Sequence, residues 1–262
     1  VIIFRMSPYD FIIPTIKKAG ELLTERSKEA FEVGIKNNDP RDVVTTVDFE
    51  INNFLIGAIR ANFPEHSIYS EEGGGEEKKN EFLWVVDPID GSSNFSRHVP
   101  HFAICVGLLE DLVPIAGAVY NPVTNELFSF KKGGGAYLNG NPISVSKISS
   151  LSEAFVFLHA GRKKELWQWG GDSYRKLLEN ANKTSNFGGS ALDACFVAAG
   201  RTEANIYGSL TTMDIASAIG ILLEAGGRVV NSAGDPVAIS TTPQKVIMTN
   251  NKEIEKALLD LI

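Results

Sequence analysis

The sequence predicts a protein of the α+β class, in which helices and a large antiparallel sheet are followed by alternating strands and helices. Three observations support this prediction. Two long segments near the N-terminus carry apolar residues at the 3.6-residue spacing of amphipathic helices. A series of short apolar segments separated by turn residues follows them, which is typical of an antiparallel sheet. Beyond residue 150, strand-like segments alternate with helical ones.

The first helix is expected over Pro8–Phe31 and the second from about Thr46, with a polar loop, Lys36–Asp42, between them. The apolar face of the first helix consists of Phe11, Ile12, Ile16, Ala19, Leu22 and Leu23. That of the second consists of Val47, Ile51, Phe54, Leu55, Ala58 and Ile59. Asp48 then falls in the first turn of its helix, where the helix dipole favours a carboxylate.

The strands of the large sheet are expected where apolar residues cluster between turns: His66–Ser70, Phe82–Val86, Ala103–Leu109, Ile115–Tyr120 and Glu126–Lys131. Asn139-Gly140 is a strong signal for a hairpin turn. The glycines at 73–75 and the charge run that follows them are expected to form a solvated loop. A boundary is expected at Lys147–Ser152. It would divide the chain into an N-terminal α+β domain, 1–150, and a C-terminal α/β domain, 151–262.

The C-terminal part is expected to alternate between the two kinds of element. Its predicted strands are Ala154–Leu158, Thr184–Phe187, Ala204–Tyr207, Arg228–Val230 and Lys245–Met248. Its predicted helices are Ser173–Ala181, Ser190–Ala199, Met213–Ala225 and Glu253–Leu261. Gly226-Gly227 closes the third of these helices, as glycine commonly does at a helix C-terminus.

Composition narrows the function classes. The chain has 262 residues, 44% of them apolar, and a formal net charge of −7. This negative charge argues against general nucleic-acid binding, which usually requires a basic surface. The two cysteines, Cys105 and Cys195, lie in apolar segments and indicate a reducing compartment. No apolar run is long enough to span a membrane, and the N-terminus lacks the features of a signal peptide. We therefore expect a cytoplasmic protein.

The most informative motif follows the strand segment that contains Trp84. The run Asp87-Pro88-Ile89-Asp90-Gly91-Ser92-Ser93 sets two carboxylates three residues apart at a predicted turn. Two close carboxylates repel each other unless a proton or a cation lies between them. Mg²⁺ prefers such oxygen ligands, often together with a substrate phosphate, and the backbone N–H groups after Gly91 suit phosphate oxygens. The motif therefore indicates a metal and phosphate site, although the same residue types are common in surface turns.

Three more carboxylates stand in comparable places, and each has a plainer interpretation. Glu71 lies at the end of a predicted strand but is also consistent with a loop charge. Asp48 and Asp214 lie at predicted helix starts, where acidic residues are favoured in any case. The four histidines, His66, His98, His101 and His159, have no spacing typical of metal ligands. His98 and His101 are expected in a loop beside the site.

Taken together, these residues resemble the inositol monophosphatase family of lithium-sensitive, Mg²⁺-dependent phosphomonoesterases. The resemblance extends from Lys36 to beyond Gly227. It rests on the order Asp48, Glu71-Glu72, the run from Asp87 to Ser92, and Asp214 followed after eleven residues by Gly226-Gly227. Further matches are Asn94-Phe95 with Pro100, Gly133–Leu138 with Asn139-Gly140, and Gly189-Ser190-Ala191. The resemblance implies a layered α/β/α/β sandwich of the inositol monophosphatase and fructose-1,6-bisphosphatase type.

The resemblance also implies residue roles. Glu71, Asp87 and the Ile89 carbonyl match the ligands of a first Mg²⁺, and Asp87, Asp90 and Asp214 those of a second. Asp48 and Ser92, with Glu71 nearby, match the groups that orient the attacking water. The substrate side is matched by Gly91, Ser92 and Ser93 for the phosphate, by Gly189, Ser190 and Ala191 near the alcohol, and by Lys36 in a flap. The implied cofactor is Mg²⁺, two or three ions per site, with Mn²⁺ as a possible substitute. A homodimer is also implied.

Three positions depart from the family pattern. Ser92 stands where many relatives have Thr, and Met213 stands where Trp is usual. Tyr207 stands where inositol-cleaving relatives have a Glu that binds ring hydroxyls, and a phenol is a different partner for a hydroxyl than a carboxylate is. Tyr207 therefore argues against inositol specificity but not against hydrolysis. We expect hydrolysis of a small phosphate monoester, of inositol or of another sugar or polyol, by water activated at the metal site.

Other substrates are consistent with the same scaffold. Fructose 1,6-bisphosphate, histidinol phosphate and 3′-phosphoadenosine 5′-phosphate are substrates of related enzymes. A bisphosphate would require a second cationic pocket, for which Arg162-Lys163-Lys164 and Arg201 are candidates. A solvated basic loop is the simpler interpretation of those residues. A regulatory protein that contacts the transcription machinery is the alternative of another class.

Overall fold

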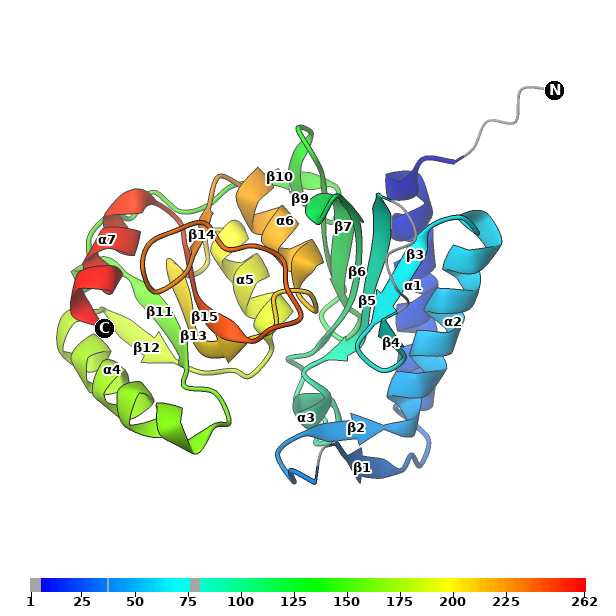
Figure 1. The fold of residues 1–262 in the computed structure, drawn as a ribbon, viewed down its shortest axis with the longest axis horizontal. Coiled ribbons are helices and arrows are strands. Elements are labelled where there is room, and N and C mark those ends of the chain that lie inside the picture. Colours follow the sequence, from blue (N-terminus) through cyan, green and yellow to red (C-terminus); the bar gives the residue numbers. More distant parts are fainter. Residues whose placement is uncertain (1–5, 37, 76–80) are drawn as a thin grey trace.

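The computed structural model describes residues 6–36, 38–75 and 81–262. Its elements are stacked in layers, which follow one another from right to left in Figure 1. Helices α1 (Pro8–Arg26) and α2 (Thr46–Asn62) cover one face of a large sheet. Helices α5 (Ser190–Ala198) and α6 (Ala216–Glu224) lie between this sheet and a smaller one. Helices α4 (Trp167–Asn180) and α7 (Lys252–Leu261) cover the outer face of the smaller sheet. The layered α+β fold is confirmed, with this outer helical layer in addition.

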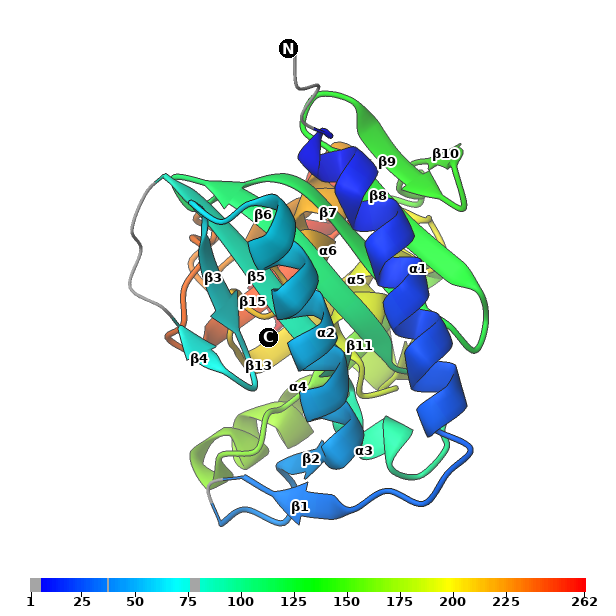
Figure 2. The ribbon, with the colours of Figure 1, turned by 90° about the vertical axis from the view of Figure 1, so that its right-hand side faces the viewer.

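The first two helices pack side by side on the large sheet, as Figure 2 shows. Ser7 caps α1 by accepting a hydrogen bond from the backbone N–H of Asp10. The helix ends at Arg26, earlier than predicted, because its apolar periodicity stops at Leu23. Phe31, which was expected to end this helix, instead stacks on Phe95 with ring centroids 5.1 Å apart.

The large sheet has the strand order β10-β9-β8-β7-β6-β5-β3-β4. Its strands are β3 (Ser67–Ser70), β4 (Gly74–Gly75), β5 (Phe82–Asp90), β6 (Ala103–Glu110), β7 (Val113–Asn121), β8 (Glu126–Lys131), β9 (Gly135–Leu138) and β10 (Asn141–Ile143). The pairing is antiparallel as predicted, except that β3 runs parallel to β5. The expected hairpin turn at Asn139-Gly140 joins β9 to β10. The expected loop after Gly75 lies partly outside the described residues.

The central helices α5 and α6 are apolar on nearly every side because sheets cover both of their faces. All residues of α6 from Ala216 to Leu222 are buried. Gly220 faces the ring of Phe130 on β8, so closely that an added Cβ would overlap the ring. Glycine at this position therefore permits close packing of α6 on the large sheet.

The smaller sheet has the order β12-β11-β13-β15-β14 and mixed pairing. Its strands are β11 (Phe155–His159), β12 (Lys183–Ser185), β13 (Ala204–Leu210), β14 (Arg228–Val230) and β15 (Gln244–Thr249). Strand β11 runs parallel to both β12 and β13, whereas β15 is antiparallel to β13 and β14. Helix α4, which covers this sheet, begins at Trp167 and not at the expected Ser173. The prediction missed its first turns because they are largely exposed and lack a strong apolar pattern.

A two-stranded sheet was not predicted. Strands β1 (Val33–Ile35) and β2 (Val43–Thr45) pair with each other below the N-terminus of α2 (Figure 1). All of β1 is exposed, so it has no alternation of buried and exposed residues that a sequence could reveal. Within the described residues, no helix is both long enough and apolar enough to cross a membrane.

Candidate functional site

The predicted site residues gather around one cleft with a volume of about 820 Å³. The cleft lies where the C-terminal end of β5 approaches β13 and the segment that precedes α6. Ten of the predicted residues line it: Glu71, Asp87, Ile89, Asp90, Gly91, Ser92, Ser93, Ser190, Tyr207 and Asp214. The other four, Lys36, Asp48, Gly189 and Ala191, bond to or directly adjoin residues of that set.

Asp87 and Asp90 do not stand in a turn as predicted, because β5 continues through Asp90. The ladder between β5 and β6 is irregular between the two residues, which allows both side chains to reach the cleft. Asp87 Oδ1 accepts a hydrogen bond from the Ile89 N–H at 3.0 Å. The carboxylate of Asp90 accepts hydrogen bonds from Ser190 Oγ at 2.6 Å and from the Ala191 N–H at 2.9 Å. Asp90 thus fixes the N-terminus of α5 to the end of β5.

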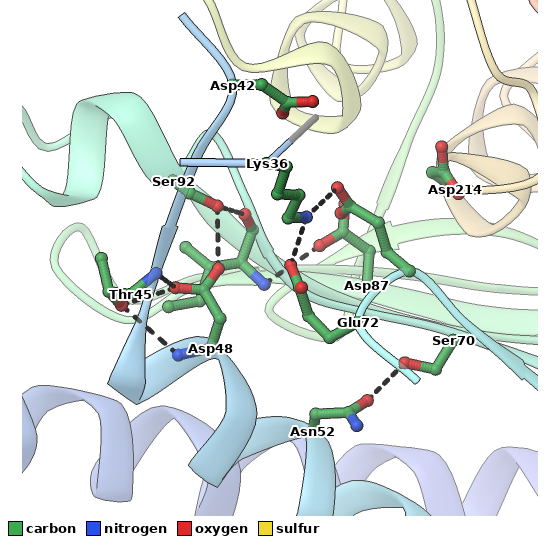
Figure 3. Close-up of polar contacts among 12 residues, drawn as sticks. Lys36, Asp42, Thr45, Asp48, Asn52, Ser70, Glu72, Asp87, Ser92 and Asp214 are labelled. Carbon is green, nitrogen blue, oxygen red and sulfur yellow. Dashed lines mark hydrogen bonds and ion pairs between the residues drawn. The ribbon is translucent and has the colours of Figure 1, made fainter. Parts of the chain in front are cut away.

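Asp48 lies in the first turn of α2, as predicted, in a capping box with Thr45. Its Oδ2 accepts hydrogen bonds from the Thr45 N–H at 2.8 Å and from Thr45 Oγ1 at 2.5 Å. Its Oδ1 accepts one from Ser92 Oγ at 2.8 Å, and that hydroxyl also lies 2.9 Å from the Ile89 carbonyl oxygen. Figure 3 shows this arrangement beside Lys36. The capping of α2 therefore holds Asp48 against Ser92.

Lys36 follows β1 directly, and its side chain reaches Glu71 at the edge of the cleft. Its Nζ lies 2.9 Å from Glu71 Oε1 and 2.5 Å from Glu72 Oε1 (Figure 3). Burial opposes the charged form of Lys36, but the two carboxylates outweigh that effect and raise its pKa. The Glu72 side chain is only 4% exposed, whereas that of Glu71 is 33% exposed. Lys36 thus ties the β1–β2 segment to the end of β3.

Asp214 lies in the turn before α6 rather than in the helix, which begins at Ala216. Tyr69 OH donates a hydrogen bond to Asp214 Oδ1 at 3.3 Å. Asp214 and Tyr69 come from positions 145 residues apart in the sequence. The large sheet and the segment before α6 therefore meet at the cleft.

The carboxyl groups in the cleft are electrostatically crowded. Burial, followed by the charges of Glu71, Asp90 and Asp214, raises the pKa of Asp87 well above its ordinary value. Burial raises the pKa of Asp90 to about 6, although its hydrogen bonds from Ser190 and Ala191 oppose this. Burial and the Glu71 charge raise the pKa of Asp214 to about 7. A proton or a cation would relieve this crowding.

The donor set fits a hard divalent cation. Carboxylates from β5, the end of β3 and the segment before α6 line the cleft, and Mg²⁺ and Mn²⁺ take oxygen ligands of this kind. Within the described parts of the chain, no three acidic, histidine or cysteine side chains already form a compact metal-binding group. Glu71 is paired with Lys36, Asp90 with α5, and Asp214 with Tyr69. Rotation of these side chains would be needed to bring them around one ion.

The backbone after Asp90 turns sharply into the short helix α3 (Ser92–Phe95). Gly91 makes this turn with a left-handed φ of 89°, and an added Cβ would lie 3.1 Å from the His101 carbonyl oxygen. Glycine is therefore required here. The N–H groups of Ser92 and Ser93 lie in the first turn of α3, where a helix leaves its N–H groups without internal acceptors.

A buried network beside the cleft was not predicted. Asp193 on α5 accepts hydrogen bonds from the Nε2 atoms of His101 and His159, each at 2.8 Å. Tyr207 OH donates to the same carboxylate at 3.2 Å. The residues are up to 106 positions apart in the sequence (101 to 207), so no spacing along the chain links them. His101 is therefore not merely a loop residue, as expected, but part of this network.

The predicted basic candidates fall into two places. Arg162 and Lys163 line the cleft, and Arg162 Nη1 pairs with Asp42 Oδ1 at 2.6 Å. Arg201 instead pairs with Glu126 and lies over the ring of Phe196, with its guanidinium carbon 5.0 Å from the ring centroid. Of the two groups, only Arg162 and Lys163 are placed to meet a molecule in the cleft.

The layered fold and the cleft, compared with known proteins, define the class: a hydrolase of phosphate monoesters. The chain belongs to the inositol monophosphatase family, since the model of that family matches residues 7–262. Members of this family are generally metal-dependent. The resemblance seen in the sequence is thereby confirmed.

Three curated relatives indicate the range of the family. An inositol-1-monophosphatase of Bacillus subtilis is 31% identical over 94% of this chain and 92% of its own length. The Nus factor SuhB of Vibrio cholerae is 33% identical over 85% of this chain and 84% of its own. A fructose-1,6-bisphosphatase/inositol-1-monophosphatase of Thermotoga maritima is 32% identical over 87% and 86%, respectively.

Solved structures are also similar. An inositol monophosphatase of Thermotoga maritima has a TM-score of 0.88 at 30% identity, covering 98% of this chain and 96% of that one. An inositol monophosphatase of Staphylococcus aureus with inositol monophosphate bound has a TM-score of 0.82 at 27% identity, covering 97% and 93%. The same protein with 2′-AMP bound has a TM-score of 0.82 at 28% identity, covering 97% and 94%.

Proposed function

We propose that this protein is a Mg²⁺-dependent phosphatase that hydrolyses a small phosphate monoester of inositol or of another sugar or polyol. One observation carries the proposal: four carboxylates from separate parts of the chain line the same cleft as Ser92, whose hydroxyl is hydrogen-bonded to Asp48. The membership of the family supports the hydrolysis of phosphate esters. The cleft geometry supports a role for divalent cations in it.

The proposed metal ligands follow from the positions around the cleft. Glu71, Asp87 and the Ile89 carbonyl would hold one cation, and Asp87, Asp90 and Asp214 a second, so that Asp87 would be a ligand of both. Bound divalent cations would polarise the phosphoryl oxygens and ease the deprotonation of water. Mn²⁺ is chemically suited to the same ligands. We propose two or three ions per site.

The chain's own groups would orient the attacking water. Asp48 accepts a hydrogen bond from the Ser92 hydroxyl, so the lone pairs of Ser92 Oγ remain free to accept a hydrogen bond from water. The bonds from Thr45 prevent Asp48 from turning away. Glu71 stands nearby as a further acceptor. An oriented water removes much of the entropic cost of the attack.

The substrate would lie between α3 and α5. The N–H groups of Ser92 and Ser93 at the start of α3, with Gly91 before them, suit the phosphate oxygens. The segment from Gly189 to Ala191 and Tyr207 border the position of the alcohol. Lys36, the flap residue, would face the phosphate side.

A bisphosphate is the second candidate substrate, because Arg162 and Lys163 line the cleft. A relative named as both fructose-1,6-bisphosphatase and inositol-1-monophosphatase supports this candidate.

A regulatory role is the alternative of another class, and the relative named as a Nus factor supports it. Further proposals are lithium sensitivity, a homodimeric state and a cytoplasmic location. The net charge of −7 supports the absence of general nucleic-acid binding.

The test is a panel of phosphate monoesters and bisphosphates scored by kcat/KM with and without Mg²⁺, with Asp90→Asn as the comparison variant. We expect Mg²⁺-dependent release of phosphate, and a loss of several orders of magnitude in Asp90→Asn, because a charged metal ligand is removed. The fold should persist, since the Asn side-chain oxygen can still accept from the Ala191 N–H. Near-normal turnover in a folded Asp90→Asn protein would contradict the proposal.

A further inference from the structure

Both oxygens of the buried Asp193 carboxylate accept hydrogen bonds from neighbouring side chains. The side chain is 0% exposed, and both of its oxygens accept hydrogen bonds at 2.8 Å, Oδ1 from His101 and Oδ2 from His159. Burial alone would raise the pKa of Asp193, but the bonds from the two imidazoles outweigh it and lower the pKa. An ionised carboxylate only accepts hydrogen bonds. Each imidazole therefore carries its proton on Nε2 and donates a hydrogen bond from it to Asp193.

The two imidazoles differ in where they lie. His159 lines the cleft. His101 packs edge-on against Phe187 and Phe196, with ring centroids 5.3 and 5.5 Å apart, and does not line the cleft. One buried carboxylate therefore positions one imidazole at the cleft wall and a second one behind it.

The His159 ring is held in a fixed orientation. His159 and Tyr207 are direct neighbours on β11 and β13, and their rings stack at 4.2 Å with an interplanar angle of 1°. The Nε2 atom is committed to Asp193, and among the described residues the His159 ring makes no other hydrogen bond. Nδ1 is thus the one ring nitrogen left for a molecule in the cleft.

We propose that His159 is a specificity-determining residue that binds a hydroxyl of the substrate's alcohol portion, with Asp193 as its positioning residue. This inference rests on the proposed phosphatase function. A hydroxyl is the group suited to Nδ1, because it donates to a neutral imidazole and accepts from a protonated one. Tyr207 also lines the cleft beside His159, but its OH is already bonded to Asp193.

The test compares two substrates that share a ring: inositol 1-phosphate, which carries ring hydroxyls, and cyclohexyl phosphate, which carries none. The variant is His159→Gln, whose amide N–H takes the place of Nε2 and keeps the bond to Asp193, while Nδ1 is lost. The matched control is His101→Gln, which alters the other partner of the same carboxylate. The measured quantity is the ratio of kcat/KM for the two substrates with Mg²⁺.

We expect the wild type and His101→Gln to prefer inositol 1-phosphate, and His159→Gln to lose about ten- to a hundredfold of that preference, as expected for one hydrogen bond to a polar site. An unchanged ratio in His159→Gln, the same loss in His101→Gln, or no preference in the wild type would overturn the inference. Failure to hydrolyse either ester with Mg²⁺ would instead contradict the proposed phosphatase function, so the two failures are distinguishable.

Discussion

Asp90 and Asp193 show how single side chains join the two sheets of this protein. Asp90 ends β5 of the large sheet and accepts hydrogen bonds from the first residues of α5. Three residues further along that helix, Asp193 accepts hydrogen bonds from His159 at the end of β11 in the smaller sheet. The pKa values of the two carboxylates shift in opposite directions. Asp193 has two imidazole donors and a lowered pKa, whereas the pKa of Asp90 is raised to about 6.

The lowered pKa of Asp193 predicts how stability depends on pH. Its carboxylate gains stabilising hydrogen bonds on folding, so this stability is present above the ordinary Asp pKa and is lost as the pH falls through the lower pKa of the folded state. At pH 7 we expect Asp193→Asn to be less stable by about 2 kcal/mol, the scale of hydrogen bonds to a charged group. Urea unfolding between pH 7 and pH 3 measures this.

The difference between wild type and Asp193→Asn should narrow at the acidic end of that range, because the wild-type carboxylate becomes protonated. A difference that stays constant from pH 7 to pH 3 would show that the Asp193 charge does not stabilise the fold.

At the scale of elements, the start of α2 connects helix capping to the cleft. Thr45 ends β2, caps α2 and holds Asp48, which in turn accepts the Ser92 hydrogen bond. Burial raises the pKa of Asp48, and the hydrogen bonds from Thr45 and Ser92 oppose this by favouring its ionised form. The capping motif therefore orients a proposed water-binding group as well as starting a helix.

Thr45→Ala should reduce both stability and activity. We expect a loss of about 1 kcal/mol, typical of a removed N-cap, and a loss of kcat of about tenfold or more, because small displacements of positioning groups are costly. Thermal unfolding and kcat with Mg²⁺ measure the two effects. The matched control is Asn251→Ala, which removes the N-cap of α7, where Asn251 accepts from the Ile254 N–H at 2.9 Å.

Asn251→Ala should lose comparable stability and keep its kcat, since α7 covers the outer face of the smaller sheet. If Thr45→Ala kept full activity, the positioning role of the α2 capping box would be wrong.

At the scale of the whole molecule, the sequence predicted the elements better than it predicted how they meet. Amphipathic periodicity located α1 and α2, and the motif around Asp87 located the cleft. The exposed strand β1 had no pattern to find. The network of Asp193 arises only when β11, β13 and α5 pack together, and local sequence carries no signal for such a contact.

The local structure predicted for the motif around Asp87 was wrong, because a turn was expected there and the structure has a strand. Asp87 to Asp90 contain Pro88 and precede Gly91, which are turn signals. The structure nevertheless continues β5 through Asp90 and places the sharp bend at Gly91. The pairing of β5 with β6 at Asp87 and again at Asp90 overrides the local turn preference.

The central claim is that acidic residues from distant parts of the chain bind divalent cations in one cleft. The most direct measurement is anomalous diffraction from a crystal of the protein soaked in Mn²⁺. The account predicts Mn²⁺ peaks in the cleft, with carboxylate oxygens of Glu71, Asp87, Asp90 and Asp214 about 2.0–2.2 Å from the ions, as is usual for hard divalent cations of this size. Mn²⁺ peaks found only elsewhere on the protein would contradict the account. So would the absence of any Mn²⁺ peak at saturating Mn²⁺, with the four carboxylates not gathered around an ion.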